Sequence, residues 1–186
     1  GARPGAYDVG ALAAVLDAVL AASETRCADL VGAGLGGMVA LRHAREYDRT
    51  ATLSLLGTAP NGDALDETAF RALYAPPEDP DAMRESLAGA FSDAFLDSDV
   101  ADQICEWRAS EDASEAGFEA QAAAALDFET GPLYEQQLPT LVCHGVDDPV
   151  VPVETGRHLA RDLPRGTFEA VEGRHLCFIE HSQAVS

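Results

Sequence analysis

The chain has 186 residues, 47% of them hydrophobic, and it carries 32 acidic against 12 basic residues for a formal net charge of −20 at pH 7. This length and apolar content suffice for one domain of ordinary size, with room for a small inserted subdomain. The negative charge excludes a nucleic-acid binder that works by phosphate neutralisation, and it argues equally against docking on anionic lipid.

The basic residues are all arginines, because the sequence contains no lysine. Such an acidic surface destabilises itself by charge repulsion in dilute buffer, and salt screens that repulsion. The composition resembles that of halophilic proteins, which work in a cytoplasm of molar salt, so we expect low salt to destabilise the fold. An acidic protein from an organism of ordinary salt content is the alternative.

No apolar stretch approaches membrane-spanning length and no signal peptide is recognisable, so we expect a cytoplasmic protein. Four cysteines, at positions 27, 105, 143 and 177, show no metal-ligand spacing, and no His/Cys cluster closes a zinc site. We therefore expect neither a metal nor an organic cofactor. Cys27 and Cys143 lie beside or within apolar runs and are interpreted as small buried hydrophobic residues.

The first third of the chain predicts helix, strand, helix and strand. Apolar residues recur at helical spacing over 9–22, and Asp8 before them is a candidate N-cap. A short apolar run at 28–31 enters the glycine-rich turn 32–37, after which the spacing is again helical. Residues 50–56 predict a second strand. Strands that alternate with helices in this way are typical of a parallel, doubly wound α/β sheet.

The pattern breaks over residues 63–137, which contain no convincing strand. This segment is rich in Ala, Asp and Glu, has large apolar residues at roughly helical spacing and is punctuated by prolines, so it predicts several short helices. The α/β pattern resumes with a strand over 138–144, a helix over 153–163 and a strand near 167–171.

These elements predict an α/β core made of residues 1–62 and 138–186, into which residues 63–137 are inserted as a helical cap. Three loops of the core follow predicted parallel strands: the glycine turn, the loop that contains Asp148, and the loop that contains His175. Open α/β sheets place their sites at this edge. The chain order is turn, acid, histidine.

That order, and three local motifs, resemble the α/β-hydrolase superfamily. The segment 30–40, Leu-Val-Gly-Ala-Gly-Leu-Gly-Gly-Met-Val-Ala, looks like its G-x-S-x-G-G nucleophile elbow. Residues 145–152, Gly-Val-Asp-Asp-Pro-Val-Val-Pro, look like its acid loop, and residues 173–176, Gly-Arg-His-Leu, like its histidine loop. Gly-Thr-Ala-Pro at 57–60 and the form of the last loop are most similar to the 3-oxoadipate enol-lactonase branch, which implies hydrolysis of a small ester or lactone.

The resemblance also implies roles for single residues. A histidine takes the proton of the attacking group, and a carboxylate fixes the tautomer of that histidine. His175 is the expected base and Asp148, which directly precedes a proline, the expected acid, with Asp147 as the second choice. The backbone N–H of Leu35 is expected to supply half of the oxyanion hole. The other histidines are interpreted as structural at 144 and as exposed or helix-surface residues at 43, 158 and 181.

The chain departs from the family pattern at the nucleophile position, which holds Gly34. A residue with a side chain is strained there by on the order of 1–3 kcal/mol, and glycine removes that strain. No covalent acyl-enzyme can form through Gly34, and Ser54 does not replace it because it falls inside the next predicted strand. The Ser-His-Asp mechanism is therefore expected to be compromised.

A second departure concerns length. The family places further strands before the first helix seen here, and the loop after one of them supplies the other half of the oxyanion hole. We expect this chain to begin after that point, with the Leu35 N–H left as one donor of two. Loss of one such donor lowers the rate by ~10²–10³ in known cases.

Three functions are open within this fold. The first is a hydrolase in which His175 and Asp148 activate water directly in the space of the missing serine. The second is a non-catalytic homologue that binds a small acid or ester under the cap. The third is an ordinary hydrolase whose serine was replaced in this copy.

A dinucleotide-binding domain is a rival interpretation from another class, because Gly32, Gly34 and Gly37 also spell G-x-G-x-x-G between a strand and a helix. That motif alone is weak. It requires an acidic residue at the end of the next strand, where this chain has Leu55, Leu56 and Gly57.

Substrate choice is expected to lie with the cap, where Trp107 could offer an apolar wall and Arg108 a cation to a carboxylate-bearing substrate. The favoured alternative is that Trp107 belongs to the core of the cap and that Arg108 pairs with Glu106 or Glu111 on the surface. The expected partner is thus a small-molecule ester or lactone, and the sequence predicts no oligomeric state.

Overall fold

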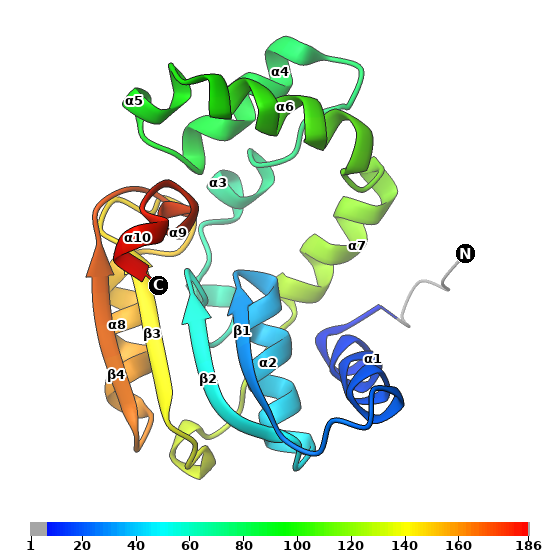
Figure 1. Ribbon diagram of the computed structural model, residues 1–186, viewed down its shortest axis with the longest axis vertical. Helices are drawn as coiled ribbons and strands as arrows, with labels where there is room; N and C mark the ends of the chain where they lie inside the picture. Colours follow the sequence, from blue (N-terminus) through cyan, green and yellow to red (C-terminus); the bar gives the residue numbers. More distant parts are fainter. Residues whose placement is uncertain (1–6, 186) are drawn as a thin grey trace.

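The computed structural model describes residues 7–185, whose four strands form one parallel sheet (Figure 1). The strands lie side by side in chain order: β1 (Ala28–Ala33), β2 (Thr50–Leu56), β3 (Thr140–Gly145) and β4 (Gly166–Val171). Because β2 and β3 are neighbours, the long segment between them leaves the sheet and re-enters it at adjacent positions.

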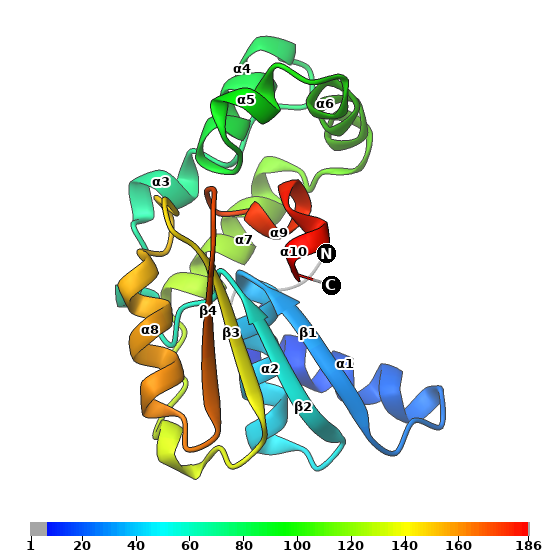
Figure 2. The same ribbon diagram turned by 60° about the vertical axis from the view of Figure 1, so that its left-hand side comes forward.

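Three helices cover one face of this sheet: α1 (Val9–Ala22), α2 (Leu35–Glu46) and α8 (Val153–Asp162). Helix α2 packs on β1 and β2, α8 packs on β3 and β4, and α1 contacts α2, as Figures 1 and 2 show. Side chains alternate between the two faces of a strand, so β2 contributes both Leu53 and Leu55 to the core. The expected parallel α/β sheet with flanking helices is confirmed.

Residues 67–111 of the segment between β2 and β3 lie above the carboxyl ends of the strands (Figure 1), and the whole segment folds into helices. These are η1 (Gly62–Ala64), α3 (Glu67–Arg71), α4 (Pro80–Ser86), η2 (Leu87–Gly89), α5 (Asp93–Leu96), α6 (Asp99–Glu111), α7 (Glu115–Leu126) and η3 (Leu133–Glu135). Asp66, Asp79, Ser98 and Ser114 begin four of them, each accepting a backbone N–H of the first turn. Helix α7 returns the chain to α2, which it contacts.

Two short helices, α9 (Cys177–Glu180) and α10 (Ser182–Val185), follow the loop after β4. Within residues 7–185, no helix combines the length and the apolar character needed to cross a bilayer.

The predicted elements agree closely with the observed ones. The first helix, with its Asp8 cap, and the strand at 50–56 have the expected bounds. The strand before the glycine turn runs two residues further than expected, because one residue, Gly34, suffices to turn the chain into α2.

Next to the sheet, the interpretations of Cys27 and His43 were wrong. Cys27 is exposed, because it precedes β1 outside the core, whereas Cys143 is buried as expected. His43 is completely buried between α2 and the start of β2, where its Nδ1 lies 2.9 Å from the Thr50 hydroxyl oxygen.

Candidate active site

A sharp turn joins β1 to α2 at Gly34, whose φ of 49° and ψ of −119° lie in a region that residues with a Cβ rarely adopt. Gly32 has a different requirement: a Cβ there would lie 2.5 Å from the carbonyl oxygen of Gly36. The tight strand-to-helix bend therefore accounts for the glycines at positions 32 and 34.

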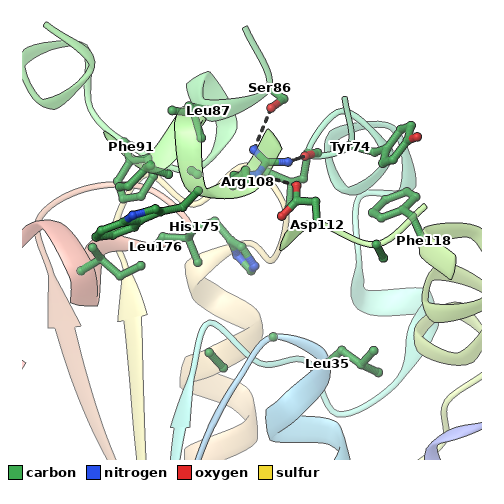
Figure 3. A pocket seen from close by; sticks show the side chains of 18 of the residues that line it. Leu35, Tyr74, Ser86, Leu87, Phe91, Arg108, Asp112, Phe118, His175 and Leu176 are labelled. Atoms are coloured by element: carbon green, nitrogen blue, oxygen red, sulfur yellow. Dashed lines mark hydrogen bonds and ion pairs between the residues drawn. The ribbon is translucent and has the colours of Figure 1, made fainter. Parts of the chain in front are cut away.

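Leu35 is the first residue of α2 and lies at the floor of a cavity (Figure 3). The first N–H groups of a helix have no acceptor within that helix, and they form its partially positive end. The backbone N–H of Leu35 thus belongs to a set of donors suited to negative charge.

Asp148 lies in the loop after β3 and is 6% exposed. Its Oδ1 accepts the backbone N–H groups of Val150 at 2.8 Å and Val151 at 3.0 Å. These bonds turn its Oδ2 toward His175, whose Nδ1 lies 2.9 Å away. Asp147, the second choice from the sequence, is exposed.

The pKa of Asp148 reflects two opposed causes. Burial alone would raise it, but hydrogen bonds from His144 and His175, the charge of His175 and the Val151 N–H lower it from 3.8 to about 2. Asp148 is therefore an ionised acceptor at neutral pH. It follows that Nδ1 of His175 carries a proton and donates it to the carboxylate.

His175 follows β4 and is 7% exposed, with its ring between two glycine positions. Its Nε2 lies 3.5 Å from the point that a Cβ of Gly34 would occupy. On the other side, a Cβ on Gly57 would lie 3.3 Å from the ring, so this glycine provides the space in which the imidazole lies. With Nδ1 protonated, Nε2 presents its lone pair toward the turn.

The helical segment holds the histidine loop in place. The backbone N–H of Leu176 donates to the carbonyl of Ala90 at 2.9 Å. The Arg174 guanidinium donates to the carbonyls of Ala88 and Phe91 at 2.7 and 2.8 Å. His175 is thus positioned from both sides, by Asp148 below and by the segment around η2 above.

A second histidine, His144 at the end of β3, contacts the same carboxylate. It is fully buried, its Nε2 donates to the carbonyl of Val151 at 2.8 Å and lies 3.4 Å from Oδ2 of Asp148. Its Nδ1 faces α8, where a Cβ on Gly156 would lie 2.4 Å away. The structural interpretation of His144 agrees with this burial, but its contact with the candidate acid was not expected.

A cavity of about 610 Å³ opens above the turn, with Gly34, Leu35 and His175 among its lining residues. Figure 3 shows the imidazole between Leu35 on the floor and the Arg108 side chain on the opposite wall. The remaining lining comes mainly from apolar residues between positions 73 and 118 and from the histidine loop. A small molecule in this cavity would therefore be in contact with the imidazole.

Trp107 and Arg108 both line this cavity. Trp107 is 58% exposed, so it does not belong to a core of the helical segment. The Arg108 Nε donates to Asp112 at 2.7 Å, and the expected pairing with Glu106 or Glu111 was wrong. Asp112 follows one helical turn after Arg108, which brings the two side chains to one face.

The structure thus brings Gly34, Leu35, Asp148 and His175 together, and it places Trp107 and Arg108 on the wall of the same cavity. Sequence reasoning missed the contact between His144 and Asp148 and the space that Gly57 provides. The positions of both residues at strand ends were the available signals. No cluster of three or more potential metal ligands occurs within residues 7–185.

Comparisons with known proteins agree with the fold. A model of the alpha/beta hydrolase family matches residues 1–186. A hydrolase from Pseudomonas aeruginosa superimposes with a TM-score of 0.81 at 25% identity, over 96% of this chain and 69% of that one. An enol-lactonase from Burkholderia xenovorans (0.80, 19%) and an esterase from Exiguobacterium antarcticum (0.78, 22%) match over 96% of this chain and 70% and 71% of theirs. A search of curated protein sequences gave no match.

Proposed function

The chain belongs to the alpha/beta hydrolase family, and we propose that it hydrolyses small carboxylic esters or lactones with water as the nucleophile. The proposal draws on the names of similar structures, which include an esterase and an enol-lactonase. Neither a metal nor an organic cofactor has a part in it.

One observation carries the proposal: the Nδ1 of His175 is held by Asp148 at 2.9 Å while its Nε2 faces the space above Gly34. A histidine fixed in this tautomer is a general base toward whatever lies in that space. A glycine at the turn leaves room there for a water molecule beside a bound carbonyl group.

The proposed reaction has two steps. Water attacks the carbonyl carbon as its proton passes to Nε2 of His175, and the carbonyl oxygen becomes an oxyanion that accepts the Leu35 N–H. The bond to the leaving oxygen then breaks, and the proton on Nε2 passes to that oxygen. The products are a carboxylic acid and an alcohol, or a single opened chain when the substrate is a lactone.

Within this proposal Gly34 occupies the position of a nucleophile without supplying one, so no acyl-enzyme forms. The helices of residues 63–137 act as a cap that sets substrate choice, with Trp107 and Arg108 in its cavity wall. The acidic, lysine-free composition supports the further proposal that the protein works in a cytoplasm of high salt.

The test is turnover of short p-nitrophenyl esters and of small lactones, followed in the presence and absence of the base. We expect His175→Ala to lower kcat/KM by at least about 10²-fold, the range of general-base catalysis. His158→Ala, an exposed histidine on α8, should leave it unchanged. Turnover that survives in His175→Ala, or labelling of the chain by a serine-directed phosphonate, would contradict the mechanism.

A non-catalytic ligand-binding homologue is the second candidate, and the absence of a side-chain nucleophile at Gly34 favours it. Saturable binding with no turnover above the His175→Ala background would select this candidate. The dinucleotide-binding alternative is not favoured, because the family match points elsewhere and β2 ends at Leu56, followed by Gly57, without an acidic residue.

A further inference from the structure

Apolar side chains line the cavity on both sides of His175. Figure 3 shows Phe91 and Leu176 on one side and Tyr74 and Phe118 on the other. The rings of Tyr74 and Phe118 stack with their centroids 5.0 Å apart. Such walls favour a ligand whose bulk is uncharged, because removal of apolar surface from water is what stabilises it there.

Among the described lining residues, Arg108, Asp112 and His175 are the ones that can carry charge near neutral pH. Arg108 is the permanent cation among them, because the guanidinium group of arginine stays charged in proteins. Among the described lining residues, Arg108 is therefore the permanent cation with which a substrate carboxylate could form an ion pair.

The guanidinium of Arg108 is already engaged on three sides. Its Nε donates to Oδ2 of Asp112 at 2.7 Å, its Nη1 to the hydroxyl of Ser86 at 2.8 Å, and its Nη2 to the carbonyl of Leu73 at 2.8 Å. These bonds join α6 to α4 and to the segment after α3. Arg108 thus links three segments of the cavity wall through its side chain.

The charge of Arg108 is also compensated. Its side chain is 21% exposed and that of Asp112 is 28% exposed, so the pair is partly withdrawn from water. A substrate carboxylate would have to displace Asp112 or enter beside its negative charge. Either change is unfavourable where the charges are partly desolvated.

From these contacts we infer that the cavity accepts neutral esters or lactones with an apolar acyl portion and rejects substrates that carry a carboxylate. The identity of the cleaved bond rests on the proposed function, whereas the charge preference follows from the cavity wall. The inference reverses the expectation that Arg108 offers a cation to an acidic substrate.

The first test compares p-nitrophenyl hexanoate with the p-nitrophenyl monoester of adipic acid, in which a carboxylate replaces the terminal methyl group. We expect kcat/KM to be at least about tenfold higher for the hexanoate. The assay is run in ~1 M NaCl, where a Debye length of ~3 Å prevents the net charge of the protein from repelling the anion at a distance. Equal or faster cleavage of the adipate ester would overturn the inference.

A pair of variants tests whether the preference for the neutral ester depends on the pairing of Arg108 with Asp112 or on the overall negative charge. Asp112→Asn removes the negative partner of Arg108 but keeps an oxygen that accepts its Nε–H, so the preference for the neutral ester should shrink about tenfold. Glu111→Gln removes the same charge from an exposed neighbour on α6 and should leave the preference intact. An equal change in both variants would contradict the inference, and thermal melts check that both are folded.

Binding of uncleaved analogues distinguishes this inference from the proposed function. The anilide of hexanoic acid and the monoanilide of adipic acid carry the same two acyl groups as the esters of the first test. Calorimetric titration measures their affinities for the wild-type chain. Tighter binding of the hexanoic anilide without any ester turnover would leave the inference standing and remove the proposed function. Tighter binding of the adipic anilide, or binding of neither, would overturn the inference.

Discussion

Side chains build one half of the candidate site, around Asp148 and His175, whereas backbone alone builds the other half, around Gly34 and Leu35. In the first half both oxygens of a buried carboxylate are engaged, and the imidazole is held in one tautomer. In the second half, a strand-to-helix bend supplies an N–H group and an open space.

This difference teaches that the two halves are independent. The base and its orienting acid depend on loops after β3 and β4, and neither loop needs a side chain at position 34 for its own hydrogen bonds. A chain can therefore retain an oriented base without a side-chain nucleophile. What the base can act on is then set by what enters the cavity.

Gly34→Ser gives the backbone half of the site a side chain that can react, and we expect the largest effect from this change. A Cβ at 34 lies 3.5 Å from Nε2 of His175, so a serine hydroxyl would be within reach of the base. Ester turnover should rise by about 10³-fold or more, since loss of a serine from a complete triad costs ~10⁶. Burst kinetics should reveal an acyl-enzyme, and Gly34→Ala is the control for strain at this positive φ. A folded Gly34→Ser chain without a burst would refute the expected geometry.

The pH dependence of the unfolding free energy tests the half of the site that is built from side chains. The pKa of Asp148 is about 2 in the folded chain, below its ordinary 3.8, so the folded state favours the ionised form. Its contribution, about 2 kcal/mol, is complete above the ordinary value and is lost as pH falls toward the folded pKa. Urea unfolding at several pH values should show this loss in the wild type and in Asp147→Asn. An equally steep loss in Asp148→Asn would contradict the assignment.

His144 tests whether the side-chain half depends on a second donor. His144→Leu leaves the Val151 carbonyl without this partner and removes one contact from Asp148, so we expect a loss of about 1–2 kcal/mol in stability. Turnover should fall as well and should recover in part in His144→Gln, which keeps an N–H donor. His43→Leu, another buried histidine, should lower stability alone. Equal turnover per folded molecule in His144→Leu and His43→Leu would assign His144 a purely structural role.

Salt should change the stability that depends on the acidic surface but not the contribution of the buried site, and we expect the smallest of the four effects from it. The net charge of −20 destabilises the fold by repulsion that salt screens, so the melting temperature should rise by a few degrees between ~0.1 and ~2 M NaCl. The fall in stability that Asp148 produces at low pH should persist at both salt concentrations, because its partners are in direct contact with it. A melting temperature independent of salt would contradict adaptation to high salt.

Much of the fold could be predicted because local patterns and tertiary structure agree. The apolar stripe after Asp8, the strand at 50–56 and the glycine turn each carry a periodicity or a backbone requirement that is local. Asp148 and His175 could be proposed because strand ends meet at one edge of a parallel sheet. Cys27 and His43 could not be assigned correctly, because burial at the end of an element depends on which other element packs there.

The sequence by itself determined which residues form the parallel strands, that a glycine turns β1 into α2, and that one acid and one histidine follow later strands. Only the tertiary structure decided that His144 shares the Asp148 carboxylate, that Gly57 makes room for the imidazole, and that Asp112 compensates Arg108. The physical reason is that hydrophobic periodicity and backbone strain act over a few residues, whereas hydrogen bonds and charge pairing depend on distances between segments that only folding brings together.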